Sequence, residues 1–166
     1  MKRILLILVL LIPVLVMAQD NSPIDKLFNK YANKDGFTTV NISGKLLGFA
    51  SKLDDSNSKE AAMLEKISAI RILSVEDSVM NKTLNFYKEL EADGFIKNNN
   101  YEVLMEVTGK DEIVRFYGRS GEKGKLSELL LVVGGNDNTL ISIRGLIDPN
   151  DIGKITGSLN LGVKTK

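Results

Sequence analysis

Four β-strands in immediate succession constrain this chain more than any other feature. Side chains alternate between apolar and polar in four runs, and the residues between the runs are rich in glycine, asparagine, aspartate and serine. Those residue types accept the positive φ angles of tight hairpin turns. The predicted strands are Tyr101–Thr108, Glu112–Arg119, Lys125–Val133 and Thr139–Ile147. We therefore predict an antiparallel meander from Tyr101 to Ile147, with the rest of the chain covering one of its faces.

The residues before the meander predict two more strands and several helices. The β-branched runs Phe37–Ile42 and Ser68–Val75 are typical of strands. Helices are predicted after Ser22-Pro23, after Ser43, over 61–66, over Ser78–Ala92, and from Asp148 to about Leu159. The expected fold class is α+β, a single domain with a largely antiparallel sheet of about six strands and helices packed on one face.

Residues 1–18 have the layout of a secretory signal peptide. Lys2 and Arg3 precede an apolar run from Ile4 to Val16, and Ala18 ends a small-residue cleavage motif. That run is shorter than the roughly 20 residues that a spanning helix needs. We therefore expect cleavage after Ala18 and an exported, soluble, periplasmic or secreted domain over 19–166, with no stable membrane anchor. Cleavage would lower the net charge from +1 to −1.

The composition excludes several functions. The chain contains no histidine and no cysteine. Catalysis by a Ser-His-Asp triad, thiol nucleophiles, structural zinc and iron–sulfur clusters are therefore excluded. The nearly balanced charge does not indicate nucleic-acid binding. We predict no cofactor, no metal site and no enzymatic activity.

Four fragments resemble functional motifs without matching them. The glycine-rich run 118–125 lacks phosphate-loop spacing and carries Leu126 where serine or threonine should stand, so a hairpin loop accounts for it. The oxygen-rich runs 54–58 and 136–138 lack the ligand spacing of a calcium loop and suit ordinary turns. Glu102 and Glu106 would stand ~13 Å apart along a strand, too far for a glycosidase pair.

Strand alternation assigns the meander residues to two faces. One face collects only apolar side chains, and we predict that it forms the core under the helices. Its residues are Val103, Met105, Val107, Val114, Phe116, Leu129, Leu131, Val133, Ile141 and Ile143. The opposite face mixes charged and apolar residues. It is interpreted either as a solvated sheet face with cross-strand charge pairs or as a partner-contact face; the contact residues would be Arg115, Arg144, Leu130, Glu102 and Glu128.

The mature chain resembles a family of small exported proteins from Bacteroidetes-type bacteria, catalogued as domain of unknown function 4252. The resemblance is carried by strand and cap residues. These are 28–31, 37–43, 70–73, 101–107, 128–132, 140–145 and the final helix that Asp148 opens. None of them is a catalytic motif. Some relatives resemble lipoproteins, from which this cysteine-free chain departs, and proximity to sigma and anti-sigma factor genes implies a link to envelope signalling.

Export and the missing catalytic side chains favour one function. We expect a non-enzymatic binding or adaptor protein of the bacterial cell envelope, with an envelope protein as partner. The alternative is a small carboxylate- or serine-dependent enzyme with its site in a loop pocket. A deep pocket with clustered acids would favour the enzyme, and a flat face with an apolar patch would favour the binding protein. The sequence leaves the oligomeric state open.

Overall fold

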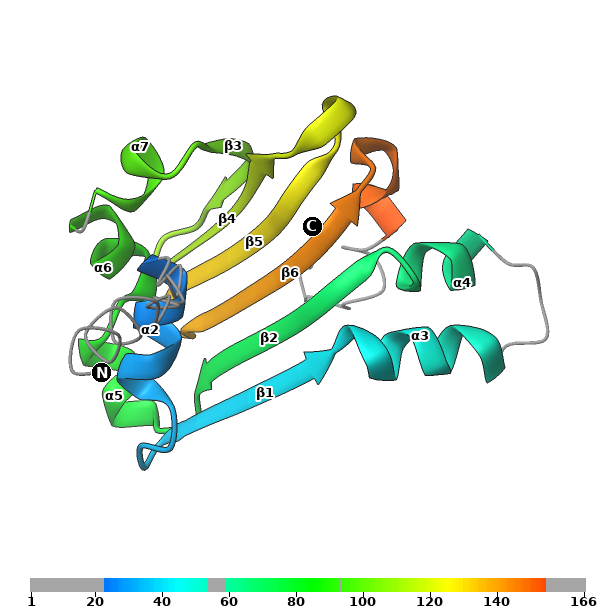
Figure 1. Cartoon of the computed structure of the whole chain (residues 1–166). Helices are drawn as coiled ribbons and strands as arrows, with labels where there is room; N and C mark the ends of the chain where they lie inside the picture. The colour runs from blue at the N-terminus through cyan, green and yellow to red at the C-terminus, as the bar shows by residue number, and fades with distance from the viewer. Residues whose placement is uncertain (1–22, 54–58, 93, 155–166) are drawn as a thin grey trace, which may run out of the picture.

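The protein is built on one antiparallel sheet of six strands (Figure 1). A computed structural model describes residues 23–53, 59–92 and 94–154. The strands are β1 (Phe37–Ser43), β2 (Ile67–Val75), β3 (Tyr101–Thr108), β4 (Glu112–Ser120), β5 (Leu126–Gly135) and β6 (Thr139–Ile147). Their order across the sheet is β1-β2-β6-β5-β4-β3, and every neighbouring pair is antiparallel. The predicted α+β class and the four-stranded meander are confirmed.

Residues 152–154 are helical after the meander, and six described helices precede it. They are α2 (Pro23–Tyr31), α3 (Gly44–Leu53), α4 (Lys59–Leu64), α5 (Ser78–Thr83), α6 (Phe86–Ala92) and α7 (Phe95–Asn98), with 3-10 turns η2 (Glu122–Gly124) and η3 (Pro149–Asp151). Figure 1 shows α3 and α4 beyond one end of β1 and β2, and α2, α5 and α6 toward the opposite end of the sheet. The connection through α5, α6 and α7 carries the chain from β2 to the far edge, from which the meander returns to β2.

The prediction of one long helix over Ser78–Ala92 is wrong, because the segment forms α5 and α6 with a break between them. Leu84 takes an extended conformation after α5. Its carbonyl accepts from Asn138 Nδ2 at 3.1 Å, and the Phe86 N–H donates to Asn138 Oδ1 at 3.0 Å. A side chain from the β5–β6 turn thus takes over backbone groups that a continuous helix would pair internally.

Helices α2, α6 and α7 cover one side of the sheet, which we call the helix face. Their apolar side chains pack on strand residues that form a continuous core. The cluster comprises Ile24, Leu27, Phe28, Tyr31, Leu73, Val75, Phe86, Leu90, Phe95, Tyr101, Tyr117, Leu130, Val132 and Leu140. The predicted apolar stripe of the first helix is confirmed, since Ile24, Leu27, Phe28 and Tyr31 are all buried.

The predicted assignment of the two faces is correct only in part. The mixed face, which includes Leu130, was predicted to meet solvent or a partner, but Leu130 and its neighbour on that face, Val132, lie in the cluster beneath α2, α6 and α7. The other side of the sheet, which we call the far face, holds a second cluster to which α3 and α4 contribute Leu47, Met63 and Leu64. Its buried members are Leu47, Ile67, Val114, Phe116, Leu129, Leu131, Ile141, Ile143 and Ile147. Both faces of the sheet are thus built from apolar side chains.

Cross-strand register places the far-face residues in straight rows. One row is Val107, Val114, Val133, Thr139, Ser74 and Thr38, and the next is Met105, Phe116, Leu131, Ile141, Ile72 and Val40. A bulge between Val103 and Met105 shifts the alternation of β3. Val103 therefore pairs with Tyr117 of the helix face, which corrects its predicted place on the same face as Met105.

The end of the described chain agrees with the predicted cap. Asp148 accepts from the Asn150 backbone N–H at 3.0 Å and opens η3. The rest of the helix predicted to about Leu159, the predicted signal peptide, Ser22 and the loop 54–58 lie outside the described residues.

Candidate functional site

The residues predicted as a partner-contact face do not form an exposed surface. Glu128 and Leu130 are both 0% exposed beneath the helices. Arg144 is partly buried beside Glu128, and Arg115 lies elsewhere on β4 with a side chain that is 17% exposed. Glu102 is exposed, but it lies on the far face. The bulge in β3 pairs it with Gly118, and Gly118 in turn pairs with Leu129 of the far face. The predicted set is thus divided between two faces.

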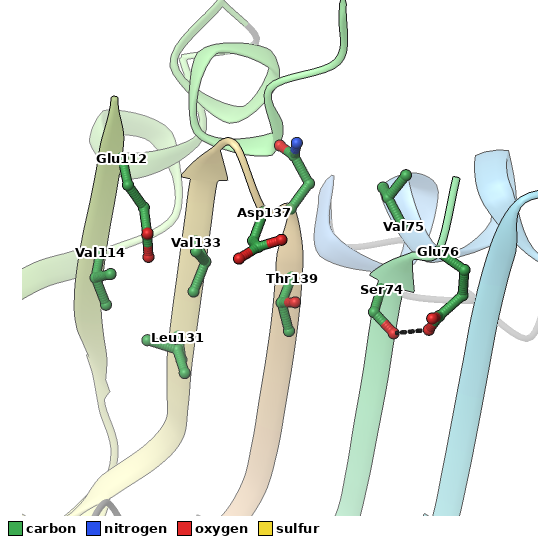
Figure 2. A pocket seen from close by; sticks show the side chains of 10 residues that line it. Ser74, Val75, Glu76, Glu112, Val114, Leu131, Val133, Asp137 and Thr139 are labelled. Carbon is green, nitrogen blue, oxygen red and sulfur yellow. Dashed lines mark hydrogen bonds between the residues drawn. The ribbon is translucent and has the colours of Figure 1, made fainter. Parts of the chain in front are cut away.

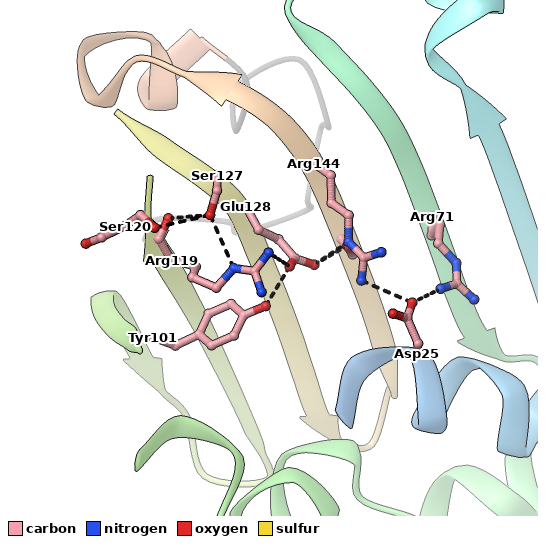
Figure 3. Close-up of polar contacts among 9 residues, drawn as sticks. Asp25, Arg71, Tyr101, Arg119, Ser120, Ser127, Glu128 and Arg144 are labelled. Atoms are coloured by element: carbon pink, nitrogen blue, oxygen red, sulfur yellow. Dashed lines mark hydrogen bonds and ion pairs between the residues drawn. The ribbon is translucent and has the colours of Figure 1, made fainter. Parts of the chain in front are cut away.

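Glu128 instead anchors a buried polar network (Figure 3). Its carboxylate accepts from Tyr101 Oη at 2.6 Å and from Ser142 Oγ at 2.5 Å. Arg144 Nε donates to the same carboxylate at 3.3 Å, and Arg119 Nη2 stands 3.7 Å from it. Several donors and two cationic groups therefore compensate a carboxylate that has lost its water.

Asp25 extends this network from the sheet to α2. Arg71 donates to Asp25 at 2.5 Å and Arg144 donates to it at 3.1 Å. The Arg71 guanidinium also lies over the Phe28 ring, 4.0 Å from its centroid. Two arginines from neighbouring strands thus fix α2 by both charge and stacking, and Asp25, in the first turn of α2, is the residue that docks the helix on the sheet.

The pKa shifts in the network fit a structural role. Burial, together with the nearby Glu128 charge, holds the pKa of Tyr101 well above its usual value, so its hydroxyl stays protonated and donates. Burial acts to lower the pKa of Arg144, but the charges of Glu128 and Asp25 outweigh it and raise the pKa. Around neutral pH, Tyr101 therefore stays a neutral donor and Arg144 a cation, whereas a general acid or base must exchange a proton there.

Arg115 belongs to a second polar group at the edge of the helix face. Its guanidinium lies 4.1 Å from the Tyr87 ring centroid, and it donates to the Tyr87 hydroxyl at 2.5 Å. Glu106 of β3 forms an ion pair with it, and Glu91 of α6 lies 3.7 Å away. Arg115 thus ties α6 to strands β3 and β4.

A pocket of about 340 Å³ opens on the far face, where four strands end (Figure 2). Its apolar lining comes from Val114 of β4 and from Leu131 and Val133 of β5. Its acidic side chains come from three different places: Glu112 starts β4, Asp137 lies in the β5–β6 turn, and Glu76 follows β2. No lysine or arginine is among the lining residues, which are Ser74, Val75, Glu76, Glu112, Val114, Leu131, Val133, Asp137, Asn138 and Thr139.

The pocket suits a cationic group carried on an apolar stem. Figure 2 shows Glu112 and Asp137 on the two sides of Val133, and Ser74 donates to Glu76 at 3.1 Å. Three carboxylates above valine and leucine side chains provide charge at the rim and apolar contact below it. Within the described part of the chain, no group of three or more acidic side chains is arranged to hold a metal ion.

Sequence reasoning missed this pocket because its acids are distant in the chain. Register is the signal that could have found it. Val114, Val133, Thr139 and Ser74 stand in one row, and Glu112, Asp137 and Glu76 all lie just beyond that row at the same end of the sheet. The strand order that puts β2 beside β6 was needed to bring Glu76 to the other two.

The comparisons with known proteins assign the chain to a family. The sequence profile of the family described as "Domain of unknown function (DUF4252)" matches residues 31–155, which include all six strands. The chain belongs to the DUF4252 family. No curated protein and no solved structure matches it. The matched DUF4252 region includes every residue of the acid-rimmed pocket but begins after most of α2.

Within the part of the chain that the structure describes, no helix has the length and apolar character that crossing a bilayer requires.

Proposed function

We propose that this DUF4252 protein is an exported, non-enzymatic binding protein of the bacterial cell envelope, and that it holds its partner at the pocket on the far face. Export rests on the signal-peptide layout of residues 1–18. A role in envelope signalling is the context that the family resemblance implies. The single observation that carries the binding role is the pocket itself.

The pocket combines features that favour recognition. Apolar side chains from two adjacent strands give contact area, and carboxylates from three separate segments give directional charge. Ordered strands hold these groups in place before a partner arrives, which lowers the entropic cost of binding. Its uniform negative charge would also favour approach of a cationic partner and disfavour an anionic one.

A carboxylate-dependent enzyme is the second candidate, and acids clustered in a pocket are the feature that the sequence analysis expected of it; this pocket gathers Glu112, Asp137 and Glu76. Two carboxylates can act as acid and base in glycoside hydrolysis. The lining offers no cationic side chain to stabilise a developing negative charge, so acyl or phosphoryl transfer fits it poorly.

Two measurements test the proposal. N-terminal sequencing of the protein recovered from the periplasm or the medium should begin at Gln19. That protein, immobilised, should retain an envelope component, and the Glu112→Gln, Asp137→Asn double variant should lose it, because charge-assisted contacts are removed while shape is kept.

The matched control is Glu122→Gln, which neutralises an exposed acid of η2 away from both the pocket and β3. Retention by this control together with loss by the double variant supports the pocket. Equal retention by all three proteins contradicts it. Turnover of aryl glycosides that the double variant abolishes would replace the binding role with the enzyme, and a protein that keeps Met1 in the inner membrane would contradict export.

A further inference from the structure

Strand β3 forms one edge of the sheet, and no strand of the described residues pairs with its outer side. It is the last strand in the sheet order and pairs only with β4. All seven residues from Glu102 to Thr108 are exposed. An edge strand presents unpaired backbone groups, which are a template for another strand.

The hairpin geometry identifies which backbone groups face outward. The Gly109 N–H donates to the Glu112 carbonyl at 2.8 Å, so these two residues form a hydrogen-bonded pair. Pairs alternate in an antiparallel ladder, and the next pair is Thr108 with Ile113. The backbone N–H and C=O of Thr108 therefore point away from β4, toward the open side.

The same strand concentrates exposed apolar side chains. Val103, Leu104, Met105 and Val107 are between 39% and 48% exposed. On the opposite edge strand, β1, Val40 is the only large apolar side chain of the described residues that is exposed. Met105 and Val107 lie in the two far-face rows described above, so a strand added at this edge would continue an existing apolar surface.

Charge selects the kind of strand that would fit. β3 carries Glu102 and Glu106 and no basic residue. Pairing with a second copy would bring four glutamates to one seam, which is unfavourable for like charges. A bulge and glutamates can also protect an edge from aggregation, but that role does not account for four exposed apolar side chains on one strand.

We propose that β3 accepts an extended segment of a partner protein as a seventh strand, and that this segment alternates apolar residues with lysine or arginine. Backbone hydrogen bonds supply the pairing, apolar side chains meet Met105 and Val107 on the far face, and basic side chains meet Glu106 on the helix face. This inference rests on the proposed function as a binding protein, but it uses a surface separate from the pocket.

The test uses acetylated octapeptides as probes for the exported protein. One peptide alternates valine with lysine, and the other alternates valine with glutamate. Amide chemical shifts are followed by NMR in the wild-type protein and in two proline variants. Thr108→Pro removes an N–H that points outward from β3. Asn41→Pro removes an outward N–H from β1; the hydrogen bond between Glu76 N–H and the Gly36 carbonyl shows which residues of β1 point their backbone groups away from β2.

The lysine peptide is expected to shift the amides of β3 and β4 in a saturable way. Thr108→Pro should weaken its binding about tenfold or more, because one ladder hydrogen bond is lost and the ring obstructs the seam. Asn41→Pro should bind it like the wild type, and the glutamate peptide should bind at least about tenfold more weakly. Thermal unfolding of both variants checks that they remain folded.

Four outcomes overturn the inference: unchanged binding by Thr108→Pro, equal binding of both peptides, no binding of the lysine peptide, or self-association of the protein that Thr108→Pro abolishes. The last would identify a second copy as the occupant. If the envelope component of the earlier experiment is lost by Glu112→Gln, Asp137→Asn and kept by Thr108→Pro, the proposed function stands and the seventh strand is rejected.

Discussion

Glu128 is the residue on which the interpretation of the sheet depends. It stands between Ser127 and a run of three leucines in β5, and the pattern of that strand alone is the same for a solvated glutamate and for a buried, compensated one. The structure distinguishes them, because Tyr101, Ser142 and Arg144 all converge on its carboxylate. These partners lie on two other strands, β3 and β6, so no local pattern in β5 indicates them.

We expect Glu128→Ala to lower the free energy of unfolding by about 3–5 kcal/mol, because the change leaves the Arg144 charge and the Tyr101 hydroxyl without their buried acceptor. Chemical denaturation measures it. Glu102→Ala, at an exposed position, is the control and should cost less than about 0.5 kcal/mol. Equal effects of the two changes would show that the network contributes nothing to stability.

The raised pKa values of the tyrosines predict that the protein loses stability in alkali. Burial raises the pKa of Tyr31, Tyr101 and Tyr117, and burial together with the bond to Glu91 raises that of Tyr87 to about 12. Unfolded tyrosine titrates near pH 10. A group whose pKa is raised on folding stabilises the fold fully below its unfolded pKa, and this contribution disappears as the pH rises toward the folded value.

We therefore expect the free energy of unfolding to fall between about pH 10 and about pH 12, with tyrosinate absorbance rising late in the folded protein. Tyr87→Phe should reduce the slope over this interval, because one of the shifted groups is gone. A folded protein whose tyrosines all ionise near pH 10, like free tyrosine, would contradict the expectation.

At the scale of elements, the sequence predicts the strands well, and it predicts the helix boundaries and the assignment of sheet faces less well. The bounds of β3 and β6 agree with prediction at both ends, because alternation and turn residues are local signals. The break between α5 and α6 was not predictable in the same way. It depends on Asn138, which lies more than 50 residues away along the chain.

The assignment of faces failed in part for a related reason. Alternation separates two sets of side chains but does not say which set meets α2, α6 and α7. Both sets contain enough apolar residues to form a core, and the charged members of the helix face, such as Arg71 and Arg144, are paired with Asp25 of α2. The bulge after Val103 added a second error that no residue pattern indicates.

Asn138 links the β5–β6 turn to the segment between α5 and α6, and we expect both to depend on it. Its side chain donates to the carbonyls of Asn81, Leu84 and Gly135 and accepts from the Phe86 N–H, and it is 1% exposed. We expect Asn138→Ala to cost about 2–4 kcal/mol, because several buried backbone groups lose their partner.

The neighbouring Asn136→Ala is the control for this change, since Asn136 is exposed in the same turn. Chemical denaturation of the two variants gives the comparison. Amide hydrogen exchange should locate the loss of protection in α5 and α6 for Asn138→Ala alone. Similar stability of the two variants would mean that the break between the helices forms without this side chain.

At the scale of the whole molecule, the sheet is shared by two apolar clusters. Phe28 of α2 packs in the cluster on the helix face and Phe116 of β4 in the cluster on the far face. The strands that carry one set of side chains carry the other on alternate residues, so neither cluster can be lost while the sheet remains. This arrangement predicts that both sides unfold in one cooperative transition.

Phe28→Ala and Phe116→Ala test that prediction. Each should lower the free energy of unfolding by about 3–5 kcal/mol, because each leaves a cavity in a buried cluster. Phe49→Ala is the control, since this phenylalanine of α3 is 60% exposed and should contribute little. Denaturation followed by both circular dichroism and tyrosine fluorescence should give a single coincident transition with an unchanged slope in all three variants. A separate early transition in Phe116→Ala would show that the far face unfolds independently of the helix face.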